Sequence, residues 1–228
     1  MLESLKNEVF EANLDLWKSG LVIDTWGNVS GFDTSRRLVV IKPSGIAYET
    51  MKPEDMVVIS LDGDLIEGTL RPSSDAPTHL WLYRHFSQLG GIVHTHSEWA
   101  TAWAQTGRAI PPYGTTHADY FHGAVPCTRV LTKEEVNGNY EENTGKVICE
   151  TFATLDPRAI PAVLCAGHGP FAWGNSPANA VHNAAVLEQV AKFAAHSEQI
   201  FSALSQTPSY LQDKHYFRKH GKNAYYGQ

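Results

Sequence analysis

Short runs of β-branched residues alternate with helix-like segments along the chain, and this alternation constrains the fold more than any other feature. Residues 38–42 and 56–60 are two such runs, and Asp62-Gly63 after the second run is a hairpin signal. These two runs predict paired antiparallel strands. The apolar runs at 91–95 and 162–166 predict two further strands that are buried in the core.

The segments between these runs have the features of helices. Apolar residues at three- and four-residue spacing over 2–16 predict an amphipathic helix that ends at Ser19-Gly20. Further helices are predicted over residues 78–86, 97–105 and 177–202.

The segment 133–152 is harder to assign. Asn137-Gly138 and Gly145 predict breaks, so we expect a turn and then a helix from about Tyr140. Strands and helices alternate along the chain without the regular spacing of βαβ units. We therefore expect an α/β chain of the α+β type, in three layers, with a central, largely antiparallel sheet flanked by helices on both sides.

The composition is that of one ordinary folded domain. The 228 residues are 43% hydrophobic and 18% charged, enough for a single core spanning residues 1–228. A net charge of −6 and scattered basic residues argue against a nucleic-acid partner. The sequence has no signal peptide pattern and no apolar run near the roughly 20 residues that span a bilayer. We expect no membrane association, a cytoplasmic location and reduced thiols at its three cysteines.

Two histidines stand at alternate positions at the end of one predicted buried strand. Residues two apart on a strand project from the same face, so His94 and His96 can bind one ion together. His168 follows another buried strand, and Asp75 lies in a rigid turn that can deliver an oxygen ligand. Buried histidines are often purely structural, as we expect of His79. The other four residues together favour zinc, because three neutral imidazoles leave a fourth position open.

Three small turns share the chemistry of anion binding: Trp26–Ser30, Lys42–Gly45 and Pro72–Asp75. Each places backbone N–H groups, hydroxyls or an amide close to the chain, and Lys42 adds one cation. Together they can hold a phosphate. Any one of them alone is an ordinary turn.

These residues resemble the class II aldolase and epimerase superfamily and, within it, the bacterial L-ribulose-5-phosphate 4-epimerases. The resemblance covers nearly the whole chain. Its motifs are TWGNVS (25–30), IKPSG (41–45), RPSSD (71–75), GGIVHTHS (90–97), GTTHADYF (114–121), HGPFAWG (168–174), RKHG (218–221) and AYYGQ (224–228). It implies a zinc-dependent enzyme that interconverts L-ribulose 5-phosphate and D-xylulose 5-phosphate.

The resemblance also implies roles for individual residues. The implied zinc ligands are Asp75, His94, His96 and His168. The implied phosphate and substrate contacts are Gly27, Asn28, Lys42, Ser44, Gly45, Ser73 and Ser74. Asp119 and Tyr226 take acid and base roles in a homotetramer whose sites lie between subunits, with His215 and Glu141 expected to support them.

Two segments depart from the epimerase pattern. Glu98-Trp99 follows the histidine pair where these epimerases more often carry a small polar or basic residue and then His, and 165–167 replaces their usual approach to the third histidine. Neither departure changes an implied ligand. They leave open a shifted substrate preference.

Inversion at C4 of this ketose cannot begin with removal of the C4 hydrogen, because the C2 carbonyl does not acidify it. Transient oxidation would need a nicotinamide, and the glycines of 167–174 do not match a dinucleotide fingerprint. Cleavage and re-formation of the C3–C4 bond is therefore expected, with zinc as Lewis acid; Mn²⁺ or Co²⁺ fit similar ligands.

Two other functions are compatible with parts of this pattern. A metal-dependent aldolase of the fuculose- or rhamnulose-phosphate type is the nearer one, although such aldolases resemble this chain with Glu where Asp75 stands. A non-catalytic interaction module of the same superfamily is the other. The retained histidines disfavour it.

Overall fold

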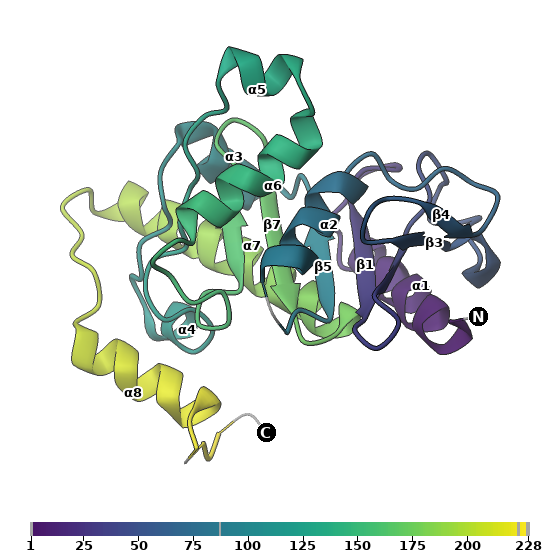
Figure 1. Ribbon diagram of the computed structural model, residues 1–228. Helices are drawn as coiled ribbons and strands as arrows, with labels where there is room; N and C mark the ends of the chain where they lie inside the picture. The colour runs from purple at the N-terminus through teal and green to yellow at the C-terminus, as the bar shows by residue number, and fades with distance from the viewer. Residues whose placement is uncertain (1, 87, 223, 227–228) are drawn as a thin grey trace.

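Seven strands form one sheet at the centre of the molecule (Figure 1). This computed structural model describes residues 2–86, 88–222 and 224–226. The sheet order is β4-β3-β2-β1-β5-β7-β6, and every pairing between these strands is antiparallel, which confirms the predicted sheet. The strands are β1 (Asn28–Asp33), β2 (Leu38–Ile41), β3 (Val57–Ser60), β4 (Leu65–Glu67), β5 (Gly91–His94), β6 (Ala162–Leu164) and β7 (Pro170–Gly174).

Helices cover both faces of the sheet, as predicted. On one face, α1 (Glu3–Lys18) and α7 (Pro177–Ile200) pack on the central strands, and α3 (Glu98–Thr106) packs on α7. On the other face, α2 (Ala76–His85) packs against α6 (Tyr140–Thr151). The shorter elements are η1 (Pro53–Asp55), α4 (Thr115–Ala118) and α5 (Lys133–Asn137). No helix in the described part of the chain has the length and apolar character needed to cross a membrane.

Successive residues of β1 face the helices on opposite sides of the sheet. The Ser30 hydroxyl is 2.7 Å from His79 Nδ1 of α2. The next residue, Gly31, faces α1, where an added Cβ would lie 2.8 Å from side-chain atoms of Leu5 and Val9. The lack of a side chain at Gly31 therefore lets α1 approach the sheet closely.

Most predicted elements are confirmed, with small shifts at their ends. Strands β1 and β7 and helices α4 and α8 (Ser209–His220) were not predicted. In the segment 133–152, the predicted break at Asn137-Gly138 and the helix from Tyr140 are confirmed. The expected break near Gly145 is wrong, because α6 runs through this residue, and the short helix α5 before the turn was not predicted.

Gly145 is a packing residue rather than a helix breaker. A Cβ at this position would lie 2.6 Å from Cβ and 2.9 Å from Cγ of Trp81 on α2. Since real Cβ atoms do not approach so closely, glycine allows α6 to pack directly on α2. The contact fixes where the first turn of α6, with Tyr140, meets the rest of the fold.

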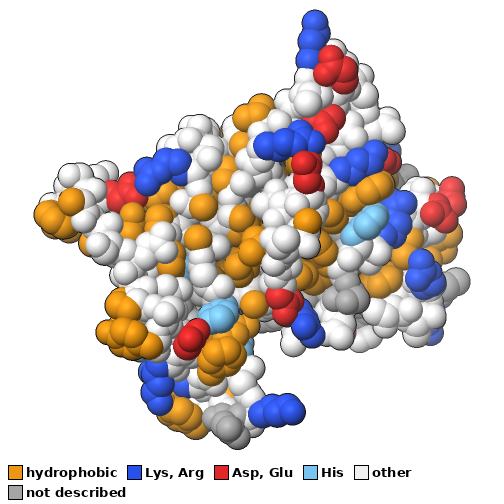
Figure 2. Space-filling model, turned by 60° about the vertical axis from the view of Figure 1, so that its left-hand side comes forward, with side chains coloured by type: hydrophobic (Ala, Val, Ile, Leu, Met, Phe, Trp, Pro, Cys, Tyr) orange, Lys and Arg blue, Asp and Glu red, His pale blue; other side chains and the backbone are white. Residues whose placement is uncertain are grey.

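The C-terminal helix α8 stands off from the body of the molecule (Figure 1). It packs on the short helix α4. Figure 2 shows this arm curving away from the body with hydrophobic side chains at its surface. Among the described residues, the large hydrophobic side chains exposed from the end of α7 onwards are Ile200, Phe201, Tyr210, Phe217, Tyr225 and Tyr226.

The contact between α6 and α2 predicts the sign of one substitution. Gly145→Ala should lower the free energy of unfolding by about 1–3 kcal/mol, the usual cost of overpacking, although alanine favours a helix by about 0.5–1 kcal/mol over glycine. Urea unfolding measures the difference. Gly114→Ala is the control, because a Cβ there meets nothing within 4 Å. Stabilisation by Gly145→Ala would show that helix propensity outweighs the contact with Trp81.

Candidate functional site

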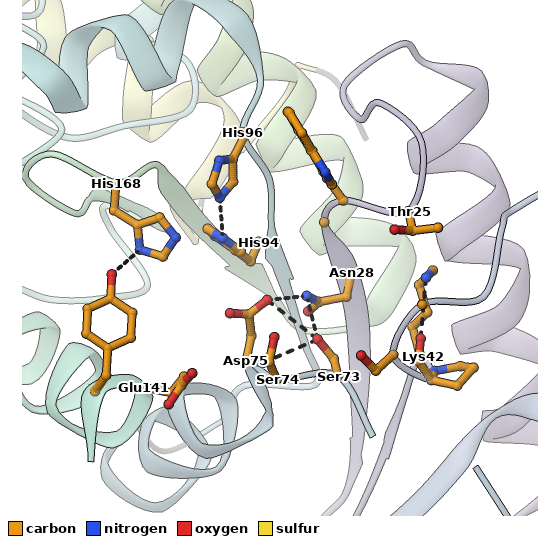
Figure 3. Close-up of a pocket in the computed structure, with 16 residues that line it drawn as sticks. Thr25, Asn28, Lys42, Ser73, Ser74, Asp75, His94, His96, Glu141 and His168 are labelled. Carbon is orange, nitrogen blue, oxygen red and sulfur yellow. Dashed lines mark hydrogen bonds between the residues drawn. The ribbon is translucent and has the colours of Figure 1, made fainter. Parts of the chain in front are cut away.

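A cavity of about 500 Å³ opens where β1 begins and β5 ends (Figure 3). Every residue predicted to bind metal or substrate lines it: Gly27, Asn28, Lys42, Ser44, Gly45, Ser73, Ser74, Asp75, His94, His96 and His168. Thr25, Trp26, Pro43 and Tyr140, which have no individual role predicted from the sequence, also line the cavity. Glu141, expected only as a supporting residue, lies in its wall. The structure thus brings together six segments that are separate in the sequence, 25–28, 42–45, 73–75, 94–96, 140–141 and residue 168.

Three histidines converge at one end of the cavity. Ligand atoms of His94, His96 and His168 all lie within 4.8 Å of one another. His94 Nδ1 donates to the carbonyl oxygen of Pro170 at 2.9 Å, which leaves Nε2 to face the cluster. His94 Nε2 lies 3.1 Å from His96 Nε2, close to the roughly 3.3 Å between two nitrogens bound to one tetrahedral zinc at Zn–N distances of about 2.0–2.1 Å.

Burial keeps two of these histidines in the form that binds metals. It lowers the pKa of His94 to about 4 and also lowers the pKa of His168. The imidazoles of His94 and His168 are therefore neutral at neutral pH, and each offers a lone pair. This donor set fits a divalent metal ion such as Zn²⁺. His79 behaves as expected of a packed residue: it is fully buried and bonded to Ser30.

Asp75 lies in the same wall, immediately before α2. Its Oδ2 accepts a hydrogen bond from Asn28 Nδ2 at 2.7 Å, and Ser73 Oγ lies 3.5 Å away. Burial alone would raise the pKa of Asp75, but the neighbouring imidazoles of His94 and His79 and the Asn28 amide hold it below its ordinary value. An ionised carboxylate beside neutral imidazoles can add an oxygen ligand.

The other end of the cavity contains a buried amine. Lys42 is 1% exposed, and its Nζ donates to the carbonyl oxygen of Ile46 at 2.9 Å and lies 4.8 Å from the centre of the Tyr48 ring. No ion pair partners it among the residues that the structure describes. Burial lowers its pKa to about 8, which leaves the amine mostly charged at neutral pH.

The two serine-bearing turns lie side by side at the Lys42 end. The backbone N–H of Ser44 donates to the carbonyl of Arg71 at 2.9 Å, and that of Ser73 donates to the carbonyl of Lys42 at 3.0 Å. These bonds join the turn at 42–45 to the turn at 71–75. Residues of all three small turns line the one cavity, and their use in binding a phosphate stays a prediction.

Asp119 and Tyr226 are not in the wall of this cavity. Asp119 follows α4 and accepts hydrogen bonds from Arg218 Nε at 3.0 Å, Arg218 Nη2 at 2.9 Å and His215 Nδ1 at 3.1 Å, all from α8. The Arg218 guanidinium also lies 4.3 Å from the centre of the Tyr226 ring. The structure therefore groups Asp119, His215, Arg218 and Tyr226 in a second cluster on the arm.

The two departures from the epimerase pattern also lie away from the cavity wall. Neither Glu98-Trp99 nor Cys165 is among the described residues that line it. The backbone N–H groups of Trp99 and Ala100 donate to the Glu188 carboxylate at 2.7 and 2.9 Å. This carboxylate caps the first turn of α3, so the Glu98-Trp99 segment has a structural role.

Comparisons with known proteins agree with this geometry. The sequence model of the class II aldolase and adducin N-terminal domain matches residues 7–195. L-ribulose-5-phosphate 4-epimerases UlaF of Salmonella paratyphi C (strain RKS4594) and Salmonella choleraesuis (strain SC-B67) are each 59% identical over 227 residues, covering 100% of this chain and of theirs. A solved L-fuculose 1-phosphate aldolase has a TM-score of 0.79 and 25% identity, covering 93% of this chain and 94% of that one.

The buried amine predicts how stability depends on pH. Between the folded pKa of about 8 and the ordinary value of 10.5, Lys42 is protonated in the unfolded chain but not in the folded one. The free energy of unfolding should therefore rise with pH across this window, by up to about 3 kcal/mol at 1.36 kcal/mol per pKa unit.

Urea unfolding of the wild type and Lys42→Met across the same window measures this effect. The difference in stability should shift in favour of the wild type as the pH rises, because only the wild type sheds a buried charge. Curves that stay parallel would contradict a buried, charged Lys42.

Proposed function

This chain belongs to the class II aldolase and adducin N-terminal domain family, and on that premise we propose that it is an L-ribulose-5-phosphate 4-epimerase. The observation that carries the proposal is the cavity, with converging imidazoles at one end and a buried amine between two serine turns at the other. A small ketose phosphate needs the metal end for its ketose oxygens and the other end for its phosphate. Relatives that share 59% of its residues over the full chain carry the name of this epimerase.

Epimerisation at C4 follows from cleavage of the C3–C4 bond. The C4 hydroxyl gives up its proton as the bond breaks, and the fragment that carries the phosphate leaves as an aldehyde. When this aldehyde turns and the bond re-forms on its opposite face, the new C4 oxygen takes a proton. No net oxidation occurs, so the reaction needs no nicotinamide.

The metal end would hold one divalent ion, with His94, His96 and His168 as nitrogen ligands and Asp75 as an oxygen ligand. We propose Zn²⁺, because neutral imidazoles and a carboxylate suit it. When bound, the ion supplies Lewis-acid stabilisation of the negative charge that develops on the ketose oxygens. Asn28 holds Asp75 Oδ2 in place at 2.7 Å.

The other end would hold the phosphate. Lys42 is the one cation in the cavity wall among the described residues, and Ser44, Gly45, Ser73 and Ser74 line the same wall. The three serine hydroxyls would donate to the phosphate, because the backbone N–H groups of Ser44 and Ser73 already donate to the carbonyls of Arg71 and Lys42. Gly27 and Asn28 lie between the two ends. A phosphate held there would keep the aldehyde fragment bound while it turns, which an epimerase requires and an aldolase does not.

Two proton donors and acceptors are needed, one for each face of the aldehyde. We propose Asp119 and Tyr226 for these roles, contributed by a neighbouring chain of a homotetramer. The support is that Asp119, which follows α4, binds Arg218 of the arm. The arm stands off the body and exposes aromatic side chains, Tyr226 among them. Head-to-tail assembly brings two different surface patches together at every interface, so each arm would complete the next cavity.

A ketose-phosphate aldolase is the second candidate, because the solved L-fuculose 1-phosphate aldolase shares this fold at 25% identity. Asp75 argues against it, since the resemblance places Glu there in aldolases. An assay of L-ribulose 5-phosphate conversion separates the two functions. An epimerase yields D-xylulose 5-phosphate, whereas an aldolase accumulates the two fragments. A metal-loaded protein that yields neither product contradicts both.

The remaining expectations stay predictions. These are a single domain over residues 1–228, a cytoplasmic location, and partners limited to a small sugar phosphate and further copies of this chain. The quoted motifs are shared by epimerases of several pentose pathways and do not select among them.

His96→Asn should lower bound metal and epimerase activity together, because it removes one of three nitrogen ligands. We expect activity to fall by more than about 10–100-fold, the usual loss when a residue that hydrogen-bonds to a metal ligand is replaced. Metal analysis and the conversion assay measure the two effects. His196→Asn, on the exposed surface of α7, should change neither. One metal ion per chain with unchanged activity in His96→Asn would show that His96 is not a ligand.

The composite site predicts complementation between two inactive variants. His96→Asn and Tyr226→Phe proteins would be unfolded together and refolded, so that some interfaces pair an intact metal end with an intact tyrosine. Activity should rise well above the sum of the separately refolded samples. Mixed assemblies that form without recovered activity would place the whole site within one chain.

A further inference from the structure

Tyr140 is a residue of the cavity wall that the proposed reaction does not use. Its hydroxyl lies 3.5 Å from His168 Nδ1, and the centres of the two rings are 6.2 Å apart. Figure 3 shows the other side of the His168 ring turned toward His94 and His96. Tyr140 therefore stands behind one of the three converging imidazoles.

Helix α2 fixes the position of Tyr140. The buried Thr78 hydroxyl of α2 donates to the carbonyl of Glu141 at 2.6 Å. One turn further on, Gly145 packs directly on Trp81 of the same helix. Since α2 begins right after Asp75, the two opposite walls of the metal end are joined through one helix.

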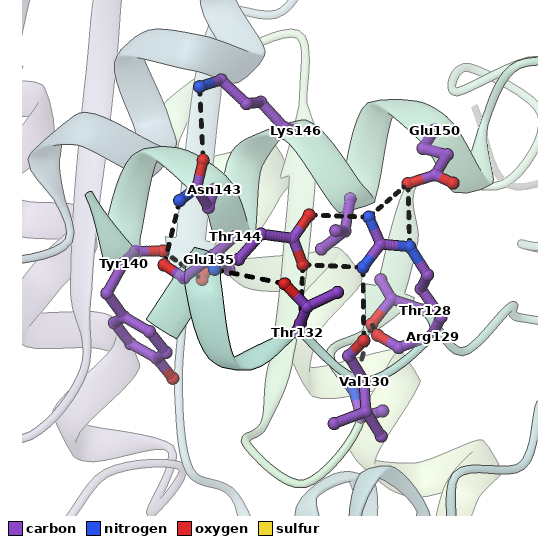
Figure 4. Close-up of polar contacts among 12 residues, drawn as sticks. Thr128, Arg129, Val130, Thr132, Glu135, Tyr140, Asn143, Thr144, Lys146 and Glu150 are labelled. Carbon is purple, nitrogen blue, oxygen red and sulfur yellow. Dashed lines mark hydrogen bonds and ion pairs between the residues drawn. The ribbon is translucent and has the colours of Figure 1, made fainter. Parts of the chain in front are cut away.

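A clamp of charged and polar groups holds the corner between α5 and α6 (Figure 4). Arg129 donates to both carboxylate oxygens of Glu135 at 2.8 Å and pairs with Glu150 at 2.9 Å. The carbonyl of Glu135 accepts a bond from Asn143 Nδ2 at 2.9 Å, which ties the end of α5 to the first turns of α6. Tyr140, the first residue of α6, follows directly on this corner.

We propose that Tyr140 is a positioning residue for His168. Its hydroxyl engages Nδ1 and holds the ring so that Nε2 faces the other two imidazoles. The carbonyl of Pro170 does the same for His94, and such partners behind a metal ligand fix its tautomer and orientation. The inference rests on the metal site of the proposed function.

Titration of the metal-free proteins with Co²⁺ alone tests this inference without substrate. Tyr140→Phe should bind Co²⁺ about 10-fold more weakly, the low end of the range for partners behind a ligand, because 3.5 Å is a long hydrogen bond. The visible spectrum of bound Co²⁺ should also change. The control, Tyr113→Phe, removes a hydroxyl that donates to Glu198 at 2.9 Å elsewhere and should leave both unchanged.

The outcomes separate this inference from the proposed function. A wild type that binds no Co²⁺ contradicts the metal site and the role of Tyr140 with it. Equal affinity and an unchanged spectrum in Tyr140→Phe overturn the role of Tyr140 alone and leave the metal site standing.

The clamp offers a second variant, one that keeps the Tyr140 side chain but loosens the corner that positions it. Arg129→Ala loosens an exposed ion pair, and such pairs contribute little, so we expect only about 2- to 3-fold weaker Co²⁺ binding. Combined with Tyr140→Phe, it should weaken binding no further, because it acts through Tyr140. Fully additive losses would contradict that path.

Discussion

The register of the three central strands determines where the groups at the metal end lie. Asn28 of β1 pairs with His94 of β5, and His94 pairs with Phe171 of β7. Paired residues project on the same face, so the Asn28 amide, the His94 imidazole and the Phe171 ring stand in one row. The Phe171 ring stacks on His94 at 4.2 Å. A slip of one residue would turn His94 toward α7 and put Val93 in its place.

Close backbone approaches make such a slip costly. Gly27 has a φ of +73°, and a Cβ there would lie 2.9 Å from the carbonyl oxygen of His94. Gly91 of β5 lies under the start of α7, where a Cβ would come within 2.6 Å of the Pro177 backbone. A shifted strand would place a side chain at one of these contacts, so the packing of the layers fixes the register and the register fixes the site.

The sequence predicted the chemistry of the site better than the elements that carry it. Polar residues that can bind a metal or an anion, such as His94, His96 and Lys42, can be recognised in the sequence whatever element carries them. Strands β1 and β7 were missed because Gly31 and Pro170 look like turn residues, although Gly31 serves a close helix contact and Pro170 uses its carbonyl. Tyr140 carries no local signal, since its position depends on tertiary contacts with α2.

Helix α8 and the residues that it contacts were even harder to predict from the sequence. Only Tyr216 of this helix is buried, so no apolar stripe marks it in the sequence. The resemblance named Asp119 and Tyr226 as a pair and included Arg218 in a motif, but it gave no role to Arg218, which binds Asp119 and stacks on Tyr226. That connection forms only when α8 packs on α4.

The cluster of Asp119, His215, Arg218 and Tyr226 affects how much of the arm would have to become ordered when the proposed assembly forms. A terminal segment that stays mobile must be ordered when it docks, and ordering side chains and loops costs free energy at that moment. Here Arg218 already joins Asp119 to Tyr226, and the backbone N–H of Tyr226 donates to the carbonyl of Arg218 at 3.2 Å. Part of this ordering is therefore already present in the single chain. An arm of this kind would dock as a preformed unit, so the proposed interface needs complementary surfaces rather than folding of the tail upon binding.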